Sequence, residues 1–489
     1  MERPAPSDEV CHSATAALER HHRLLFYAVL LFALALRLLG LSKGIWLDEF
    51  STLDLIASED LLRALRAYDH PPLYFVLIKL WSTIHGGEPF VRLPSVLFGV
   101  LTVAIIMIWI RRYSVPASLL SGLACAAMPE MLRFSQEIRG YSLLLLASAI
   151  AFYFASRIAF APGRLVGYAG VAAALSVAVS THFVGAFVVP AVTLFVALSA
   201  IDLRRIRPLA ATAALAVPTV IFLFFYLFFM DAGARDKSGG WWMPLPSLEL
   251  IERYLGVSRS AVLVLIPVGI VFVAILLWAG NWRRSLPFLA GAACYWTLLI
   301  AYSFLNVPIF WTRTALPGLV PLLGFASLQL ASVRTRAFRR VLVFGLLVCV
   351  LASVANWTSD TAWKPVEEWR EIGRTVKSEW NPSVLVVFFP AYVEGPVRHY
   401  FPELPANRTI SLNNNANEEQ LRSLERRIRA GDSPTVLLVE RHSLAVQDAP
   451  ETRDRIRLLL RRELAGPAVV AQRRKLSVVR YGGDPAHHP

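Results

Sequence analysis

A short stretch between the first two long apolar runs carries residues suited to acid–base chemistry. Asp48 and Glu49 follow the first run directly, and Tyr68, Asp69 and His70 come about twenty residues later. A carboxylate close to a second carboxylate and a histidine can act as a general base toward a hydroxyl group. Aspartate and histidine can instead bind a divalent metal ion. A surface loop can also simply carry solvated acids, so composition alone leaves all three interpretations open.

A second group of polar residues lies at the ends of later apolar runs. Glu137, Arg139 and Tyr141 occur in the sequence SQEIRGY, His182 lies in a tight turn, and Arg313 opens another run. The planar donors of arginine suit a lipid phosphate. Snorkelling removes most of the penalty for a charge at the rim of a membrane helix, so a structural role stays open. For His182 the alternative is a capping or interface role.

The composition of the chain indicates a membrane protein. Its 489 residues are 56% hydrophobic and only 17% charged, whereas soluble domains carry about 25% charged residues. The net charge of +14 could indicate nucleic-acid binding, but the arginines cluster at the ends of apolar runs, where they set membrane orientation. We therefore expect no nucleic-acid partner. The four cysteines form no CxxC pair, which argues against a zinc knuckle or a disulfide framework.

Apolar length predicts about eleven transmembrane helices. They cover approximately residues 24–41, 93–110, 114–129, 141–161, 165–181, 183–201, 208–230, 260–280, 286–305, 314–332 and 340–356. The apolar segment 72–84 is shorter and predicts a helix at the interface or one that re-enters the membrane. The first run is followed by acidic sequence and not by the small-residue cleavage site of a signal peptide. We therefore expect this run to be retained as a span.

The charges of the loops predict the orientation. If residues 1–23 form a cytoplasmic tail, the cytoplasmic loops are basic, with Arg111, Arg112, Arg157, Arg164, Arg204, Arg205, Arg207, Arg283, Arg284, Arg334, Arg336, Arg339 and Arg340. The opposite loops mix both signs. This is the positive-inside pattern. An odd number of spans then places the C-terminal segment, and all the polar groups above, on the extracytoplasmic side.

The region 358–489 predicts a small α/β domain. Residues 383–390, 435–440 and 476–481 are typical of strands, and they alternate with helical patterns at 365–379, 418–430 and 451–464. The predicted organisation is a cytoplasmic tail at 1–23, a membrane domain at 24–357 with its first outer loop at 42–92, and an extracytoplasmic domain at 358–489.

Polar groups gathered on one side of the membrane suit a lipid-linked sugar. Acids could act on a hydroxyl, arginines on a phosphate, and aromatic rings on a sugar or a lipid tail. This requires Asp48 and Arg139 to share one pocket at the outer surface. A polyprenyl-lipid or glycolipid transporter is the alternative, but its spans should be polar or broken near the midplane, and internal repeats should be evident. A noncatalytic scaffold is a third possibility.

Six motifs in sequence order resemble a known family. They are WLDEF, YDHPPLYFVLIKLW, FVRLPSVLFG, SQEIRGYSLLLL, THF and RTALPGLVPLLGF, within residues 24–335. They resemble GT-C glycosyltransferases of the dolichyl-phosphate-mannose protein mannosyltransferase superfamily, whose bacterial branch includes lipid A aminoarabinose transferases. The resemblance implies an all-α polytopic GT-C fold with a small extracytoplasmic α/β domain. It also implies inverting transfer of a hexose or pentose from a polyprenyl phosphate, at the outer face of a bacterial inner membrane.

The resemblance also assigns roles to individual residues. Asp48 matches the catalytic aspartate that deprotonates the acceptor, and Glu49 supports it. Asp69 falls where aminoarabinose transferases place an acidic residue near a bound metal ion. His70 falls where they place a lysine that contacts the donor phosphate. Because histidine is neutral over much of the physiological range, this departure favours a metal or acceptor role for His70.

The remaining positions complete the predicted site. By the same resemblance, Arg139, Arg313 and His70 hold the donor phosphate, and a divalent ion at Asp69 and His70 is the only cofactor expected. Substrate contacts are predicted from Tyr68, Tyr74, Glu137, Tyr141 and His182. Cations that stabilise the leaving phosphate and one base on the acceptor suffice for the transfer. The acceptor is a lipid, a polysaccharide or a protein; a protein is disfavoured because the large luminal module of the protein mannosyltransferases is missing.

Overall fold

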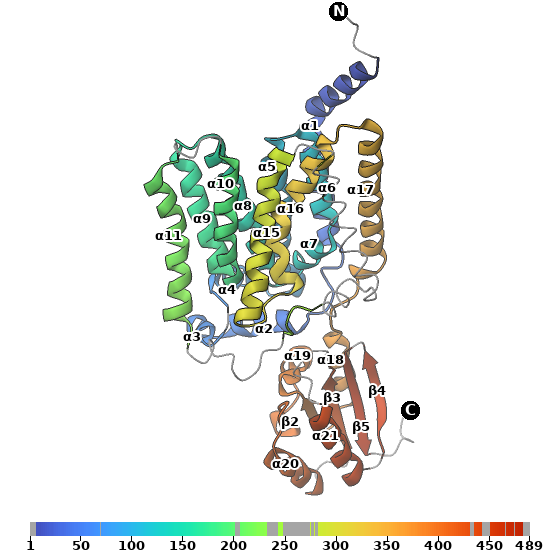
Figure 1. The fold of residues 1–489 in the computed structure, drawn as a ribbon. Coiled ribbons are helices and arrows are strands. Elements are labelled where there is room, and N and C mark those ends of the chain that lie inside the picture. Colours follow the sequence, from blue (N-terminus) through green and yellow to red (C-terminus); the bar gives the residue numbers. More distant parts are fainter. Residues whose placement is uncertain are drawn as a thin grey trace, which may run out of the picture. The chain divides into compact units, whose positions relative to one another are not determined.

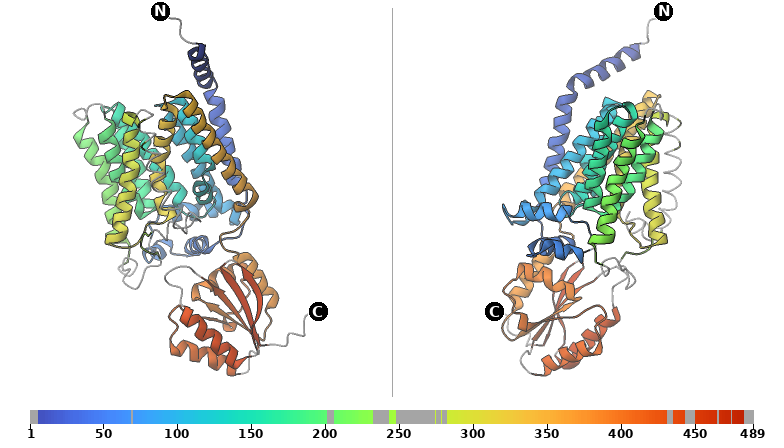
Figure 2. Two further views of the ribbon diagram at one scale, coloured as in Figure 1. Left: turned by 45° about the vertical axis from the view of Figure 1, so that its right-hand side comes forward. Right: turned by 90° about the vertical axis from the view of Figure 1, so that its left-hand side faces the viewer.

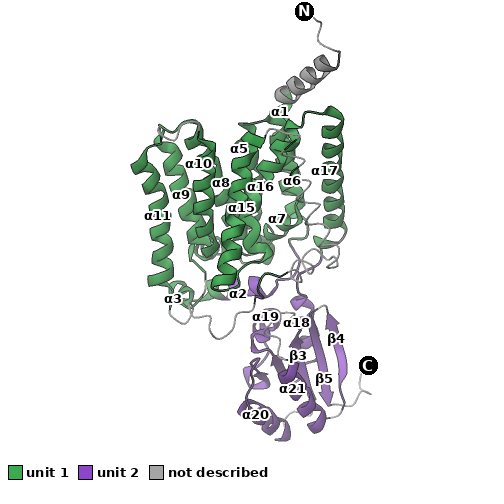
Figure 3. Ribbon diagram, viewed as in Figure 1, with its two compact units in different colours: residues 1–41, 55–239, 245–363 green, residues 42–54, 240–244, 364–489 purple. Residues whose placement is uncertain are grey.

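The structure is a computed structural model of the chain. It describes residues 6–68, 70–200, 206–231, 243–247, 274, 278, 282–430, 435–442, 450–464, 466–473 and 475–482, without the side chains of 6–20 and 360. Asp69 and the predicted span 260–280 lie outside the described residues. The chain divides into two compact units (Figure 3). Unit 1 comprises residues 1–41, 55–239 and 245–363, and unit 2 comprises residues 42–54, 240–244 and 364–489.

Unit 1 is a bundle of apolar helices that lie side by side in all views (Figures 1 and 2). Its main helices are α1 (Pro6–Leu38), α5 (Glu88–Arg111), α6 (Val115–Ala127), α8 (Tyr141–Phe160), α9 (Leu165–Thr181), α10 (Val188–Ser199), α11 (Pro208–Leu223), α15 (Trp282–Leu305), α16 (Thr312–Ser332) and α17 (Arg336–Asn356). Seven helices of the described residues are long and apolar enough to cross a membrane. The predicted polytopic membrane fold is therefore confirmed. The number of spans stays a prediction, because α6, α9 and α10 are shorter.

Short elements connect these helices. They are α2 (Leu47–Ala57), which straddles the boundary between the units, α3 (Leu61–Arg66), α4 (Leu73–Ser82), α7 (Pro129–Phe134), the 3-10 helix η1 (Phe183–Phe187) and the π-helical turns η3 (Phe224–Phe229) and η4 (Trp357–Thr361). The predicted short helix at 72–84 is confirmed as α4. Gly40 closes the end of α1 with a φ of 70°, and a Cβ there would lie 1.7 Å from the Ala362 carbonyl oxygen. Only glycine fits this position.

Aromatic side chains fill the centre of unit 1. The ring of Trp109 in α5 stacks on Phe152 of α8 and Phe288 of α15, with centroids 5.6 and 4.9 Å apart. All three side chains are buried. Fifteen of the twenty residues of α8 are buried as well, as expected for a helix that is apolar on all sides and surrounded by others.

The larger part of unit 2 is an α/β domain around a five-stranded sheet. Its strands are β1 (Val384–Phe389), β2 (Thr409–Ser411), β3 (Thr435–Arg441), β4 (Ala468–Arg473) and β5 (Leu476–Gly482), in the order β2-β1-β3-β5-β4. Strand β1 is parallel to β2 and β3, with Val386 opposite Leu437, and β5 is antiparallel to β3 and β4. A register shift interrupts the β4–β5 pairing between Val469 and Ala471.

Helices cover both faces of this sheet. Val384, Val386 and Phe388 share a core with α18 (Trp369–Glu379) and α19 (Glu394–Tyr400). The alternate residues of β1 share a second core with α20 (Glu418–Arg429) and α21 (Pro450–Glu463). A strand buried on both faces needs the continuous apolar run seen in the sequence. The predicted α/β class is confirmed, whereas β2, β4 and α19 were not predicted.

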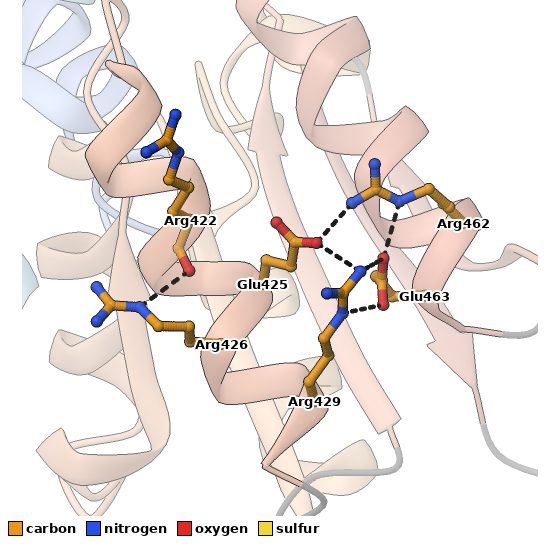
Figure 4. A network of polar contacts seen from close by, with 6 residues as sticks. All are labelled: Arg422, Glu425, Arg426, Arg429, Arg462 and Glu463. Carbon is orange, nitrogen blue, oxygen red and sulfur yellow. Dashed lines mark hydrogen bonds and ion pairs between the residues drawn. The ribbon is translucent and has the colours of Figure 1, made fainter.

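Ion pairs join α20 to α21 on the surface of the domain (Figure 4). Arg429 pairs with Glu463 at 2.9 Å, and Arg462 pairs with Glu425 at 2.8 Å. Hydrogen bonds from Arg429, and then from Arg462, lower the pKa of Glu463 to about 2. Exposed pairs of this kind contribute little to stability individually, so the apolar cores above account for most of the domain's cohesion.

Candidate functional site

The predicted arginines and one predicted histidine meet around a single tyrosine in unit 1. Arg139 precedes α8, His182 follows α9, and Arg313 lies in the first turn of α16. The Tyr141 ring lies 5.9 Å from the Arg139 Cζ atom, 5.8 Å from the Arg313 Cζ atom and 5.4 Å from the His182 ring. Both arginines are buried. Segments distant in the sequence therefore place two guanidinium groups at one end of the bundle.

Two side chains from the loop between α3 and α4 orient Arg139. Its Nη1 donates to the Tyr68 hydroxyl at 3.1 Å, and its Nη2 lies 3.3 Å from the His70 Nε2. Because a guanidinium only donates hydrogen bonds, His70 accepts through Nε2. This contact places the proton of a neutral His70 ring on Nδ1. His70 thus contacts the predicted phosphate-binding arginine through the nitrogen that a metal ion could otherwise use.

His182 caps the turn that follows α9. Its Nδ1 accepts a hydrogen bond from the Val184 backbone N–H at 3.2 Å, so Nε2 carries the proton in the neutral ring. Its ring also lies edge-on to the His70 ring, with centroids 4.8 Å apart. The capping role considered from the sequence is present, and the same side chain also borders the arginine cluster.

A glycine lets three helices converge beside this cluster. A Cβ on Gly140 would lie 2.9 Å from the Thr181 Cγ2 atom and 3.3 Å from the Tyr74 Cβ atom. The start of α8 therefore packs directly against the end of α9 and the start of α4. Tyr74 is buried, and its hydroxyl lies 2.9 Å from the Ser95 Oγ atom. Its described contacts thus fix α4 to α5, while its predicted substrate role stays a prediction.

Glu137 is buried in the turn before Arg139. Its Oε1 accepts from the Arg133 Nε at 2.9 Å, and its carbonyl oxygen accepts from the Arg139 N–H at 2.8 Å. The carboxylate therefore pairs with an arginine outside the cluster, while the backbone shapes the turn that presents Arg139. In α16, the Thr314 hydroxyl accepts from the Trp311 N–H at 2.8 Å and fixes the turn that presents Arg313.

Arg37 supports the site, and our sequence reasoning did not single it out. It lies in α1, is buried, and donates from Nε to the Ser135 Oγ at 3.2 Å. Its other nitrogens donate to the Cys125 and Ala126 carbonyl oxygens at the end of α6. Gln136 donates back to the Arg37 carbonyl oxygen at 2.9 Å. An arginine inside a predicted span was the available signal, because such charges are rare and usually functional.

Asp48 and Glu49 lie in the first turn of α2, within the part of this helix assigned to unit 2. The buried Glu49 carboxylate accepts from the Trp46 N–H at 3.3 Å, as a residue of this type does in a capping box. Acidic residues in the first turn also interact favourably with the helix dipole. Glu49 therefore fixes the start of the helix, and Asp48 is half-buried beside it. Proximity of Asp48 to Arg139 stays a prediction.

The metal site predicted at Asp69 and His70 also stays a prediction. Asp69 lies outside the described residues. Among the residues that the structure does describe, no group of three or more His, Cys, Asp or Glu side chains is arranged to hold a metal ion.

The fold defines the class of the protein: it is a polytopic membrane protein with the GT-C glycosyltransferase fold. Residues 69–227 match the family model of dolichyl-phosphate-mannose-protein mannosyltransferase. The chain is similar to ArnT from Cupriavidus metallidurans in the apo state, with a TM-score of 0.55 and 17% identity over 94% of this chain and 98% of that one. ArnT bound to undecaprenyl phosphate gives a TM-score of 0.56 at 17% identity, over 94% of this chain and 97% of that chain.

A more distant similarity extends to the archaeal oligosaccharyltransferase AglB from Archaeoglobus fulgidus, in complex with an inhibitory peptide and a dolichol-phosphate. Its TM-score is 0.50 at 12% identity, over 96% of this chain and 75% of that chain. No curated protein matches the chain. At these identities the structural similarities establish the fold, so the GT-C fold expected from the sequence is confirmed.

Proposed function

We propose that this protein is a glycosyltransferase that takes a sugar from a polyprenyl-phosphate-linked donor and transfers it, with inversion, to an acceptor. The observation that carries the proposal is the pair of buried guanidinium groups beside Tyr141. Arginines at the end of an apolar bundle suit a phosphate whose hydrocarbon tail lies along the helices. The ligands of the similar structures, undecaprenyl phosphate in ArnT and a dolichol-phosphate in AglB, belong to the same chemical class.

The proposed reaction needs one base and one anion site. Asp48 accepts the proton of an acceptor hydroxyl, and the hydroxyl oxygen attacks the anomeric carbon of the donor sugar. The bond from that carbon to the phosphate oxygen breaks on the opposite face, which inverts the configuration. Polyprenyl phosphate leaves with the bonding electrons, and Arg139 and Arg313 stabilise its charge. Tyr68 and His70 hold Arg139 in place for this step.

Binding of undecaprenyl phosphate to the purified protein in nanodiscs tests the anion site. Each of Arg139→Gln and Arg313→Gln removes a charged donor worth about 1.5–3 kcal/mol, which is roughly a 10- to 150-fold loss of affinity. Arg164→Gln is the matched control, because Arg164 is exposed at the opposite ends of α8 and α9. Affinities of all three variants equal to wild type would contradict the assignment.

Consumption of a labelled polyprenyl-phosphate sugar tests the base. Asp48→Asn should bind undecaprenyl phosphate as wild type does but release sugar about 10²–10⁴-fold more slowly. A lipid transporter would instead move undecaprenyl phosphate across a vesicle membrane without releasing sugar. Equal sugar release by Asp48→Asn and wild type would refute the catalytic role of this carboxylate.

We also propose that unit 2 lies on the extracytoplasmic side of a bacterial inner membrane, because the basic loops mark the other side. A cysteine introduced at the exposed position Ser378 in α18 should react in intact cells with a maleimide that cannot cross membranes. A cysteine at the exposed Gly163, in the loop between α8 and α9, should react only after lysis. The reverse pattern would invert the proposed orientation.

A further inference from the structure

The segment that carries Asp48 is fastened to the α/β domain within unit 2. The Ile45 N–H donates to the Tyr400 hydroxyl at 2.9 Å. Arg370 donates from Nη1 to the Ser42 carbonyl oxygen at 2.8 Å. These contacts join residues more than 300 positions apart in the sequence. The chain just before α2 is therefore tied to α18 and α19.

A tight apolar contact lies on the other side of Asp48. The Phe50 ring lies edge-on to the His399 ring, with centroids 6.4 Å apart. A Cβ on Gly395 would lie 2.5 Å from the Phe50 ring. Glycine at this position of α19 allows Phe50 to pack directly on the helix backbone. Contacts before and after Asp48 thus come from the same domain.

Glu367 links these contacts to the sheet. The carboxylate is buried, and its Oε2 accepts from the Leu47 N–H at 3.2 Å and from the Trp369 Nε1 at 2.7 Å. Its Oε1 accepts two hydrogen bonds from Arg441, the last residue of β3, at 2.9 and 2.7 Å. Two charge-assisted hydrogen bonds from one guanidinium hold the carboxylate in a fixed direction. The first N–H of α2 is therefore held by a group that is anchored in the sheet.

The start of α2 needs such external support. The helix has 11 residues, and isolated helices of that length are marginal in water. Glu49 and Glu367 supply acceptors to the N–H groups of Trp46 and Leu47, the two residues immediately before Asp48. Helix starts leave such N–H groups without intrahelical partners. The backbone at Asp48 is consequently fixed by its own helix and by the domain.

We propose that Glu367, held by Arg441, is a positioning residue for Asp48, and that the C-terminal α/β domain holds the base-bearing end of α2 in its reactive geometry. The proposal rests on the proposed function, because it takes Asp48 to be the base. A misplacement of about 1 Å in a reacting group lowers rates about 100-fold. A domain that fixes the backbone beside the base therefore acts on the rate without touching the substrate.

Hydrogen exchange of the full-length protein in nanodiscs tests the attachment. Glu367→Gln presents an amide N–H₂ group either to Arg441 or to the Leu47 N–H, Tyr400→Phe removes the hydroxyl at Ile45, and Gly395→Ala displaces Phe50. Each variant should accelerate exchange in the peptide 42–54 by about 5- to 30-fold, as expected for the loss of about one or two kcal/mol of contacts. Gly466→Ala, a change in open space in the same domain, is the control.

Two further measurements on the same variants separate positioning from general damage. Sugar release from the labelled donor should fall about 10- to 100-fold, whereas undecaprenyl phosphate binding should stay within about twofold of wild type. The β1 peptide, residues 384–389, should exchange as in wild type. If Glu367→Gln unfolds the domain and accelerates this peptide too, Tyr400→Phe and Gly395→Ala decide the question.

The outcomes are distinguishable. Unchanged exchange in 42–54 in all folded variants would overturn the attachment. Faster exchange there with undiminished sugar release would overturn the positioning role. Faster exchange with slower release and intact lipid binding would support it. If wild type releases no sugar from the labelled donor, the proposed function fails. If Asp48→Asn releases sugar as wild type does, only the assignment of Asp48 as the base fails. In both cases the exchange data still decide whether the domain holds α2.

Discussion

Replacing Arg37 by methionine tests how the turn before Arg139 is held in unit 1. The guanidinium contacts the Ser135 hydroxyl and the Ala33, Cys125 and Ala126 carbonyl oxygens. Two of these carbonyls end α6, where a cation also interacts favourably with the helix dipole. Methionine fills a similar volume, so the change removes the hydrogen bonds and leaves little cavity.

The expected loss of unfolding free energy is about 2–4 kcal/mol. The lower figure takes roughly 0.6 kcal/mol for each of the four hydrogen bonds, the average measured between membrane helices. The upper figure takes about 1 kcal/mol for each of the same four bonds, less than the roughly 1.5–3 kcal/mol of a good bond from a charged donor, because the carbonyl contacts are 3.1–3.4 Å long. The unfolding free energy of Arg37→Lys should lie between those of wild type and Arg37→Met, since a lysine cannot reproduce the forked geometry of the guanidinium.

Unfolding of the purified protein by SDS titration in mixed micelles, followed by tryptophan fluorescence, measures this loss. Arg284→Met is the control, because Arg284 is exposed and a surface change of this kind should stay within about 0.5 kcal/mol. Undecaprenyl phosphate binding should also weaken in Arg37→Met, because Ser135 and Gln136 lead into the turn that presents Arg139. Equal unfolding free energies of Arg37→Met and Arg284→Met would refute the reasoning that Arg37 caps α6 and anchors this turn.

Three further predictions follow from single contacts. Gly40→Ala should lower the melting temperature in detergent far more than Gly345→Ala, because the added methyl group would lie 1.7 Å from a backbone carbonyl oxygen, whereas the control meets open space. Tyr68→Phe should weaken undecaprenyl phosphate binding about fivefold in a direct titration, since it removes a hydrogen bond worth about 1 kcal/mol from Arg139, the proposed phosphate ligand. The Arg429 hydrogen bond is the main reason that the pKa of Glu463 falls from 4.5 to about 2, so wild type should melt above Glu463→Gln at pH 6 and lose that advantage as the pH falls toward 2. A constant difference between pH 6 and pH 2 would contradict this last expectation.

The sequence predicts those parts of the fold that depend on one segment at a time. Apolar length is such a property, so the segments 93–110 and 141–161 were recognised as the helices α5 and α8. The same holds for β1, whose six buried residues form an unbroken apolar run. Strand β4 was missed because it lies at the edge of the sheet, where Val469 is exposed and the short apolar run ends at Gln472 and Arg473.

The site depends on contacts that no single segment contains. Residue types at the rims of predicted spans were enough to single out Arg139, Arg313 and His182, which meet at Tyr141. The residues that hold these side chains and α2 in place could not be predicted in the same way. The contact between Glu367 and the start of α2 joins positions 320 residues apart. The residues next to Glu367 in the sequence do not indicate that its carboxylate is buried or which partner it binds.

The helix α17 has a consequence for how this protein tolerates change. Almost none of its residues are buried within unit 1, and Val341, Phe344 and Leu351 are largely exposed. The hydrocarbon of the bilayer, which has no shape to match, is therefore the main environment of these side chains. Exchanges among apolar residues should be nearly neutral here, and membrane thickness should influence this helix more than any one neighbouring side chain does. Substitutions in this helix should therefore be tolerated as long as its length and its apolar character are kept.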